Sequence, residues 1–586
     1  MPKYRANFVY THICIIFSCA LILLPGCLYA ADLQEPDGLI NYYDRFHPTI
    51  ARAGMVVSQN EIASEVGAQI LKQGGNAIDA AVATAFSLAV TLPRAGNLTG
   101  GGFMLLYLAE EDTSLTINYR EVAPAAASEN MFLDKNSEPV ADLSLHTLAA
   151  AGVPGTVAGL FYAHSNYGKL SWKQVIKPAE KLARQGIVFN DDMYRNFAIT
   201  EGLRQNPESC RVYFKPGCNL YRPGDIFKQT DLANTLAYIA RHGRDGFYKG
   251  KIAKQIIAEM EKSGGLISAE DLANYQVEIR PAIRGTFNGY DIVTMPPPSS
   301  GGVHLVQMLN MFEVLASKDL SPGSAKLMHI QAEIFKRAYA DRSKYLGDTD
   351  FVKVPTAGLT DKKYARELAK TIKAGAITPS DKIHPGKPPG YESPDTTHFS
   401  AVDKAGNVVS STYTLNHSFG SGITIPGTGM LMNNTMDDFV AKAGVPNSYG
   451  LVGGKANAIA PLKHPLSSMT PTIVFKNGKP FLATGTPGGS KIISAVFQQL
   501  VNVLFFDMNL AEATNAPRIH HQWQPDVLYV EEGVNTDSIA LLKNMGYKVE
   551  LSKSLGSLQS LMLKDGAALG AADPRRPHAK AVAVDH

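Results

Sequence analysis

Two kinds of hydrophobic pattern divide the chain. Apolar positions three and four residues apart predict helices between residues 58 and 95, broken at Gly74-Gly75, and the run from Ile78 to Val90 is apolar nearly all round, as in a buried helix. Similar patterns predict helices at 172–185, 230–241, 250–264, 324–345 and 360–374. β-Branched or alternating runs predict strands at 398–403, 408–415, 472–476 and 479–484. The chain therefore combines a helix-rich first part with a strand-rich second part.

Two of these helices carry capping signals at their starts. Ser58 followed by Glu61 three residues later matches a capping box. Thr360 is placed to cap the last helix, which Gly375 would end. We expect these helices to begin directly after Ser58 and Thr360.

The change from helical to strand patterns falls at residues 382–395. Residues 382–394 are rich in proline and glycine, which predicts an exposed and extended connector. The first strand then begins near Thr396. This linker marks the boundary between the two parts of the chain.

The four predicted strands fold into two hairpins. A turn at 404–406, with Gly406 in the position that needs a left-handed residue, lets Asp403 face Asn407. In that register Thr396 falls opposite Thr414, with one residue of slippage allowed for a bulge.

The second hairpin turns at Asn477-Gly478, the strongest short hairpin signal, so that Lys476 faces Lys479. Extending this register brings Ser467-Ser468 and Gly488-Gly489 to the same end of the hairpin.

Composition and charge narrow the class of protein. Hydrophobic residues make up 45% and charged residues 19% of the 586 positions, which excludes a disordered chain. The formal net charge is +3, and Lys3 and Arg5 supply part of it. A nearly neutral chain argues against nucleic-acid binding as the main function.

The first 30 residues have the layout of a secretory signal peptide. Lys3 and Arg5 precede an apolar run from Ile13 to Leu24, and small residues follow at Ala30-Ala31. The run is shorter than the roughly 20 residues that a membrane span needs, and no later run reaches that length. We expect an exported protein, periplasmic or secreted. The segment ending in Cys27 also resembles a bacterial lipobox, which would leave that cysteine lipidated.

Only Cys210 and Cys218 remain after removal of the signal. An even pair in an oxidising compartment can form a disulfide that closes a short loop. The alternative is two buried free thiols. Neither interpretation makes them catalytic.

Thr396 is a candidate nucleophile. By itself a threonine at a strand start reflects only β-propensity. If the chain is cut between Asp395 and Thr396, however, Thr396 gains an α-amino group that titrates near neutral pH and can accept the proton of its own hydroxyl.

Gly488-Gly489 offers consecutive backbone N–H groups that suit an oxyanion, although a tight turn would explain the same residues. Motifs for a phosphate-binding loop, a zinc hydrolase, a thiol redox enzyme and an ordinary serine hydrolase are absent from the sequence.

Together these residues resemble the γ-glutamyltransferase (γ-glutamyl transpeptidase, glutathione hydrolase) family of N-terminal nucleophile hydrolases. The resemblance runs from about Ala51 to about Pro574. It is carried by the segments 96–103, 119–124, 295–302, 396–400, 433–439, 465–469 and 485–490.

The resemblance implies an α+β fold, a four-layer αββα sandwich built from two subunits of one autoprocessed precursor. After removal of residues 1–30, the cut at Asp395–Thr396 would give a large subunit, 31–395, and a small catalytic subunit, 396–586, which form a heterodimer. No metal or organic cofactor is implied.

The resemblance also assigns roles to individual residues. Thr396 is the nucleophile, Thr414 hydrogen-bonds near it, and Gly488 and Gly489 form the oxyanion hole. The substrate α-carboxylate is expected to bind to Arg120, Ser467 and Ser468. The α-ammonium is expected to bind to Asn416 and Asp438.

Two further positions bear on substrate binding. Thr435 stands where relatives carry Gln or Glu, so one ligand of the α-amino group is shortened or lost. Residues 443–454, with Tyr449, resemble the family's lid loop over the donor site; a mobile surface loop is the plainer interpretation.

The implied reaction is hydrolysis and transfer of the γ-glutamyl group. Thr396 would attack the γ-amide of glutathione or a related γ-glutamyl compound, and water, an amino acid or a short peptide would accept the group. One alternative is a glutaryl or cephalosporin acylase, whose substrates lack the α-amino group; Asn416 and Asp438 argue against it. Another is an inactive homologue that serves as a binding protein, which the complete set of site residues disfavours.

Overall fold

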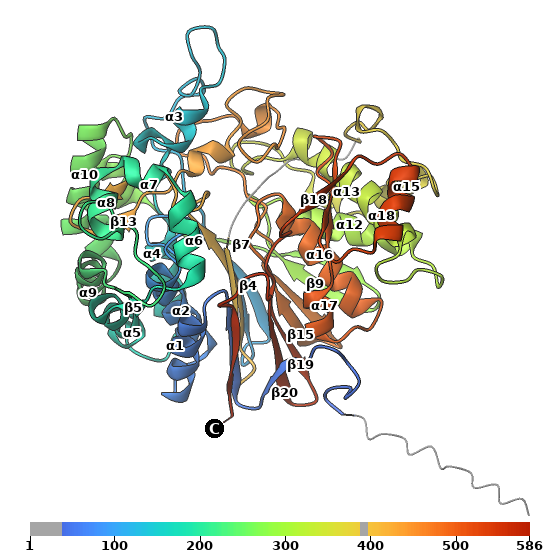
Figure 1. The fold of residues 1–586 in the computed structure, drawn as a ribbon, viewed down its shortest axis with the longest axis horizontal. Coiled ribbons are helices and arrows are strands. Elements are labelled where there is room, and N and C mark those ends of the chain that lie inside the picture. The colour runs from blue at the N-terminus through green and yellow to red at the C-terminus, as the bar shows by residue number, and fades with distance from the viewer. Residues whose placement is uncertain (1–37, 387–396, 586) are drawn as a thin grey trace, which may run out of the picture. The chain divides into compact units, whose positions relative to one another are not determined.

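Two antiparallel sheets lie at the centre of the fold (Figure 1). The computed structural model describes residues 38–386 and 397–585. The chain separates into Met1–Asn41, whose described residues 38–41 carry no helix or strand, and Tyr42–His586, which holds all the elements below.

Each central sheet has seven strands. The order in the first sheet is β21 (Lys580–Val584), β2 (Gly54–Ser58), β10 (Thr397–Asp403), β11 (Val408–Thr414), β3 (Gly101–Leu108), β4 (Thr113–Tyr119), β7 (Glu278–Arg280). The order in the second sheet is β1 (Thr49–Ala51), β20 (Ala567–Ala572), β19 (Gln559–Lys564), β15 (Lys479–Thr484), β14 (Thr472–Lys476), β9 (Tyr290–Thr294), β8 (Ile283–Phe287).

Helices cover the outer face of each sheet, which completes four layers (Figure 1). Over the first sheet lie α1 (Glu61–Lys72), α2 (Ala77–Thr91), α4 (Thr156–Tyr167), α5 (Trp172–Gln185) and α9 (Thr230–Tyr248). Over the second lie α12 (Gly301–Leu315), α13 (Ala325–Tyr345), α16 (Lys491–Leu504) and α17 (Leu510–Asn515). Every residue of α2 is buried, as its apolar pattern predicts. The αββα sandwich is therefore confirmed.

The remaining elements surround these layers. The helices are α3 (Ala141–Leu145), α6 (Asp191–Ile199), α7 (Gly202–Gln205), α8 (Pro207–Tyr213), α10 (Lys251–Ser263), α11 (Ala269–Asn274), α14 (Thr356–Leu359), α15 (Lys362–Lys370), α18 (Thr536–Asn544). The strands are β5 (Ile187–Val188), β6 (Ile226–Phe227), β12 (Thr424–Ile425), β13 (Met430–Leu431), β16 (Ile519–His520), β17 (Leu528–Glu531), β18 (Val549–Ser552).

The first predicted hairpin has the expected register. β10 and β11 pair Val402 with Val408 and continue without a shift to Thr397 and Tyr413. Thr414 is the next position on β11. Its predicted partner, Thr396, lies outside the described residues, as do Asp395 and most of the predicted linker.

The second hairpin follows the predicted register only near its turn. Lys476 faces Lys479 as expected, but a bulge between Val474 and Phe475 shifts every earlier pair by one residue. A bulge adds one unpaired residue to one strand, which the sequence pattern does not reveal. The segments around Ser467 and Gly488 still leave the hairpin at the same end.

Two predicted helix caps are wrong. Ser58 is the last residue of β2 and pairs with both Phe399 and Lys580, so Asn60 caps α1 by accepting from the Ala63 N–H. Asp361, one residue after Thr360, caps α15. In the first case the central sheet outweighs the local capping signal.

The layer between the sheets changes from apolar to polar along β10 and β11. At their hairpin end Val402 and Val408 belong to an apolar cluster with residues of the second sheet. At the other end His398 bridges Thr412 (2.9 Å) and Ser400 (3.0 Å), and all three are fully buried. Burial lowers the pKa of His398 to about 3, so its ring is neutral at neutral pH. This polar end of the layer lies at the start of β10, the strand that directly follows the predicted nucleophile Thr396.

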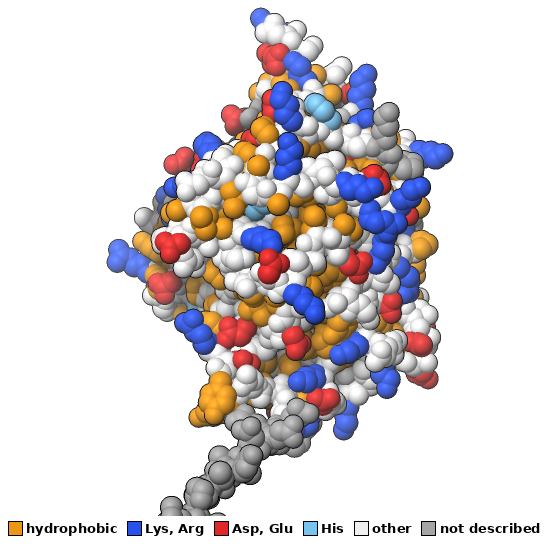
Figure 2. Space-filling view, turned by 90° about the vertical axis from the view of Figure 1, so that its right-hand side faces the viewer, with side chains coloured by type: hydrophobic (Ala, Val, Ile, Leu, Met, Phe, Trp, Pro, Cys, Tyr) orange, Lys and Arg blue, Asp and Glu red, His pale blue; other side chains and the backbone are white. Residues whose placement is uncertain are grey.

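The surface carries mixed charge. On the face shown in Figure 2, Lys and Arg side chains and Asp and Glu side chains are interspersed among uncharged ones. Within residues 38–386 and 397–585, no helix combines the length and apolar character that crossing a bilayer requires.

Candidate active site

The predicted site residues come from loops at one end of the first sheet. Because neighbouring strands are antiparallel, the start of β10, the end of β11, the start of β3 and the end of β4 lie at this same end. Thr414 ends β11 and pairs with Gly101. Arg120 directly follows β4. We call this the nucleophile end of the sheet.

Thr414 orients the loop that follows it. Its hydroxyl oxygen accepts from the Asn416 backbone N–H (2.7 Å). Asn416 has a positive φ of 76°, and its side chain donates to the Asn434 carbonyl (3.0 Å). The buried Asn416 Oδ1 has no hydrogen-bond partner among the described residues. The hydrogen bond to Asn434 holds the side-chain amide in place, so Oδ1 is an oriented acceptor, as an ammonium ligand requires.

Arg120 is completely buried and ion-paired. Its Nη2 contacts Asp438 Oδ2, its Nη1 lies 3.2 Å from Glu121 Oε2, and its Nε donates to the Pro465 carbonyl (3.1 Å). The Asp438 side chain is also fully buried. The structure thus brings together two charges that the sequence analysis assigns to opposite ends of one substrate head group.

Glu121 is part of this cluster, although the sequence analysis gives it no role. Burial raises the pKa of its carboxyl group, and Arg120 opposes that shift only in part. Glu121 Oε1 is buried without a hydrogen-bond partner in the described part of the chain. Its position directly after Arg120 is the signal that could have identified it.

Ser467 and Ser468 approach the cluster from the segment after Pro465. The Ser467 backbone bonds to the loop before α12, accepting from the Ser300 N–H (2.8 Å) and donating to the Pro298 carbonyl (3.0 Å). Both serines are fully buried, and the Ser468 hydroxyl has no hydrogen-bond partner among the described residues. Ser468 therefore retains a donor for a ligand.

Gly488 and Gly489 lie just before α16, with Ser490 between Gly489 and the first residue of the helix. Both have positive φ values, 136° and 65°, which favour glycine. A Cβ at Gly488 would lie 3.3 Å from the Gly556 Cα. Their place at a helix N-terminus supports a negative charge nearby, because the helix dipole is positive there.

Thr435 is directed into the protein. It is fully buried, and its hydroxyl donates to Asn433 Oδ1 (2.7 Å). A Cβ at Gly152 would lie 2.8 Å from the Thr435 Oγ1. That Thr435 shortens or removes one ligand of the substrate amino group remains a prediction.

The loop 443–454 folds back over the neighbouring segments. Tyr449 donates its hydroxyl to the Asn416 carbonyl (3.1 Å), and its ring stacks on His417 at 4.6 Å. Ser448 donates to Asp437, and His417 Nε2 lies 2.7 Å from the Ser448 Oγ. The sequence analysis gives His417, Asp437 and Ser448 no individual role, because their contacts join separate segments of the chain.

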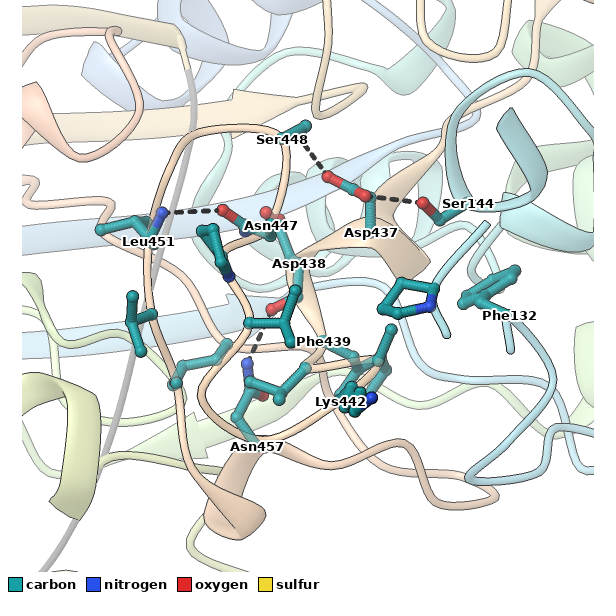
Figure 3. Close-up of a pocket in the computed structure, with 18 of the residues that line it drawn as sticks. Phe132, Ser144, Asp437, Asp438, Phe439, Lys442, Asn447, Ser448, Leu451 and Asn457 are labelled. Atoms are coloured by element: carbon teal, nitrogen blue, oxygen red, sulfur yellow. Dashed lines mark hydrogen bonds between the residues drawn. The ribbon is translucent and has the colours of Figure 1, made fainter. Parts of the chain in front are cut away.

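A cavity of about 340 Å³ lies beneath this loop (Figure 3). Asp438 is the one predicted substrate ligand on its wall, and Asp437 faces it while accepting from Ser144 (2.8 Å). Asn457 donates to the Asp438 carbonyl (2.7 Å). Most other lining residues are apolar, including Phe132, Val140, Leu145, Met436, Phe439, Leu451 and Leu466. The cavity adjoins the buried ion pair.

A second ion pair supports the Arg120 loop. His464 Nε2 lies 3.4 Å from Glu278 Oε1, and its Nδ1 bonds the Glu121 carbonyl oxygen (2.9 Å). Burial alone would lower the pKa of His464, but Glu278 and Asp348 outweigh it and raise that pKa above its usual value. Burial would raise the pKa of Glu278, but His464 and Arg280 outweigh burial and lower that pKa to about 2.

We expect the effect of Glu278→Gln on stability to depend on pH. The lowered pKa of Glu278 stabilises the fold above about pH 4.5, and this effect is lost as pH falls toward 2. The raised pKa of His464 stabilises the fold below about pH 6.5, and this effect is lost as pH rises through the folded-state pKa. The loss of Tm in the variant should thus be larger near pH 5.5 than near pH 8.5. Equal losses at both pH values would contradict the assignment.

Cys210 and Cys218 are joined by a disulfide, with their Cα atoms 4.9 Å apart. The bond connects α8 to the turn that follows it.

The chain is similar to known proteins in both sequence and structure. The model of the family described as gamma-glutamyltranspeptidase matches residues 63–583. The chain is 51% identical over 559 residues to the Escherichia coli K12 glutathione hydrolase proenzyme, which covers 94% of this chain and 96% of that protein. Its structure is similar to cephalosporin acylase from Bacillus halodurans (TM-score 0.83, 26% identity, 94% of this chain and 99% of that one). It is also similar to a chain of Helicobacter pylori gamma-glutamyltranspeptidase (TM-score 0.56, 45% identity, 57% and 96%).

Proposed function

The chain belongs to the gamma-glutamyltranspeptidase family, and we propose that it cleaves the γ-glutamyl amide of glutathione and related compounds and passes the group to water, amino acids or short peptides. The observation that carries this proposal is the buried ion pair of Arg120 and Asp438 at the nucleophile end of the sheet.

This ion pair suits the head group of a γ-glutamyl compound. An α-amino acid carries a carboxylate and an ammonium on one carbon, and burying either charge alone is costly. A preformed pair of opposite charges offers each of them a partner. The carboxylate is bound by Arg120 with Ser467 and Ser468, since a guanidinium matches a carboxylate in shape and charge. The ammonium is bound by Asp438 and by Asn416 Oδ1, which accepts no hydrogen bond from the described residues.

The chemistry follows from an N-terminal threonine. The Thr396 hydroxyl attacks the γ-carbonyl carbon and its proton moves to the Thr396 α-amino group. The tetrahedral oxyanion binds to the backbone N–H groups of Gly488 and Gly489. The C–N bond then breaks, and the leaving amine takes the proton. Water or an acceptor amine attacks the resulting ester and releases the γ-glutamyl group.

Processing and export belong to the same proposal. Residues 1–30 are removed as a signal peptide, and cleavage at Asp395–Thr396 yields subunits 31–395 and 396–586, which remain together as a heterodimer. The name of the Escherichia coli relative, a proenzyme, supports cleavage. The enzyme is periplasmic or secreted.

The similarity to a cephalosporin acylase supports a second candidate, an acylase that accepts glutaryl groups. A glutaryl group has the same carboxylate but no ammonium, so Asp438 would then be a buried charge without a ligand.

Purified protein tested with γ-glutamyl- and glutaryl-p-nitroanilide separates the two candidates. We expect faster release of p-nitroaniline from the γ-glutamyl donor and formation of γ-glutamyl-glycylglycine when glycylglycine is present. Preference for the glutaryl donor would favour the acylase.

A further inference from the structure

In the described part of the chain, two arginines outside the proposed donor site lack partners for part of their guanidinium groups. Arg94 lies in the loop after α2, with its side chain only 11% exposed, and Arg576 lies shortly before β21. Arg94 Nη2 and Arg576 Nε are buried and have no hydrogen-bond partner among the described residues. Such donors are costly to bury unless a ligand completes them.

The two guanidinium groups also lie close enough to repel each other. Burial first, and then the charge of Arg576, lower the pKa of Arg94 to about 10, so Arg94 remains charged at neutral pH. Asp192 lies 3.5 Å from Arg94 Nε and balances one of the two charges. In the described part of the chain Arg576 forms no ion pair.

Nearby carboxylates are already paired with other cations. Asp573 pairs with Arg518 (2.6 Å) and Arg575 (3.0 Å), and Glu531 also pairs with Arg575 (2.5 Å). Glu61 pairs with Lys580. Within residues 38–386 and 397–585, the Arg94–Arg576 pair is left with one excess positive charge and with unpaired donors.

The sheet places this pair at the nucleophile end. Lys580, at the start of β21, pairs with Ser58, which in turn pairs with Phe399 near the start of β10. Arg576 precedes Lys580 by four residues, and Arg94 precedes Gly101 at the start of β3 by seven. Both arginines therefore lie at the same end of the sheet as Thr414 and Arg120.

Backbone and side-chain contacts bring the two segments together. The Glu61 N–H donates to the His578 carbonyl (2.6 Å), and Asn60 donates to the Thr91 carbonyl (3.4 Å). The start of α1 thus joins the segment of Arg576 to the loop of Arg94. On its other side this loop meets the residues after Asn416, because the Phe419 N–H donates to the Arg94 carbonyl (2.9 Å).

The strand order separates Arg576 from the donor head-group site. β21 lies on one side of β10, and β4, which carries Arg120, lies on the other. Strands are spaced about 4.8 Å apart, so β21 is roughly 10 Å from β10. A dipeptide extends about 7 Å from the bond that is cut. A peptide that points away from Arg120 can therefore bring its terminal carboxylate within reach of an arginine side chain.

We propose that Arg94 and Arg576 form an anion site that binds the terminal carboxylate of the peptide that leaves, or accepts, the γ-glutamyl group. This inference rests on the proposed function and adds recognition of the peptide half of the reaction. The carboxylate accepts hydrogen bonds from Arg94 Nη2 and Arg576 Nε and neutralises the excess charge.

Recognition of the leaving peptide is tested by comparing kcat/KM for glutathione with kcat/KM for its C-terminal amide. The comparison is made in wild type and in the variants Arg576→Ala, Arg94→Gln and Arg576→Lys. We expect wild type to prefer glutathione. In the Ala and Gln variants this preference should fall about 10-fold to 100-fold, the usual effect of losing one charge-assisted hydrogen bond. Arg576→Lys should restore part of it. Arg284→Ala, which removes an exposed arginine from β8, is the matched control and should leave the preference unchanged.

The acceptor is tested by transfer from γ-glutamyl-p-nitroanilide to glycylglycine and to glycylglycinamide. Collapse of the preference in the glutathione arm alone assigns the site to the leaving peptide, and collapse in the transfer arm alone assigns it to the acceptor. Unchanged preferences in both arms would overturn the proposal. Hydrolysis of γ-glutamyl-p-nitroanilide, whose leaving group has no carboxylate, reports the proposed function separately and should be the same in all variants.

Discussion

Thr396→Ala is expected to leave the chain uncut and without measurable γ-glutamyl transfer. In an N→O acyl shift the Thr396 hydroxyl attacks the carbonyl carbon of Asp395, the amide becomes an ester, and water then hydrolyses the ester. The same hydroxyl later attacks the substrate. Alanine removes both steps, because no α-amino group is released and no nucleophile remains.

Intact-mass measurement decides this prediction. Wild type should give two fragments that meet at Asp395–Thr396, and the alanine variant should give one full-length species. Thr396→Ser keeps the hydroxyl and should still be cleaved, which controls for a disturbed linker. Two fragments from Thr396→Ala would remove Thr396 from processing and would assign the cut to another group.

Asp438→Asn is expected to abolish most of the preference for γ-glutamyl over glutaryl donors. The substitution keeps the shape of the side chain but removes the charge that faces Arg120 and, as proposed, the substrate ammonium. Removing one partner of a buried charge pair costs about 2–5 kcal/mol, which is roughly 30-fold to several thousand-fold in kcat/KM. Glutaryl donors carry no ammonium, so the ratio of the two rates should approach parity.

The neighbouring carboxylate provides a matched control. Asp437 lies one residue away but contacts Ser144 and Ser448 rather than Arg120. Asp437→Asn should therefore change the ratio much less than Asp438→Asn. A comparison of kcat/KM for γ-glutamyl- and glutaryl-p-nitroanilide in the three proteins gives the answer. An unchanged ratio in Asp438→Asn would show that Asp438 does not recognise the amino group, and the acylase candidate would gain support.

The ion pair between Arg120 and Asp438 also affects the interpretation of Asp438→Asn. Arg120 loses its ion pair with Asp438 when the charge is removed and keeps the one with Glu121. Both donors need Arg120 for their carboxylate, so this secondary effect lowers both rates. The ratio removes it, which is why the ratio and not the absolute rate is the informative quantity.

Local pattern was sufficient for several elements of the fold. The helical pattern at 172–185 corresponds to α5 at Trp172–Gln185, and the pattern at 324–345 corresponds to α13 at Ala325–Tyr345. The predicted helix at 230–241 ends where Gly243 adopts a positive φ of 61°, although a further turn follows the kink in α9. In each case a period of 3.6 residues and a nearby glycine or cap provide the information, and both are local.

Other strands could not be read from local pattern. β3 is buried at every position, so it shows a continuous apolar run that does not distinguish a strand from a buried helix. β2 is likewise buried throughout, and pairing on both of its edges makes Ser58 a strand residue instead of a helix cap. Such strands are defined by their neighbours in the sheet, which are far away in the sequence.

The sequence by itself determined the β10–β11 register, because the turn at Gly406 and the alternation of side chains are set by adjacent residues. Together with the family motifs, it also indicated which residue types serve the site. Only the tertiary structure decided that Arg120 and Asp438, 318 positions apart, form one buried pair, and that Arg94 and Arg576 lie together without a full set of partners among the described residues. The physical reason is that the environment of a charge depends on what packs around it, and loops from distant strands supply that packing.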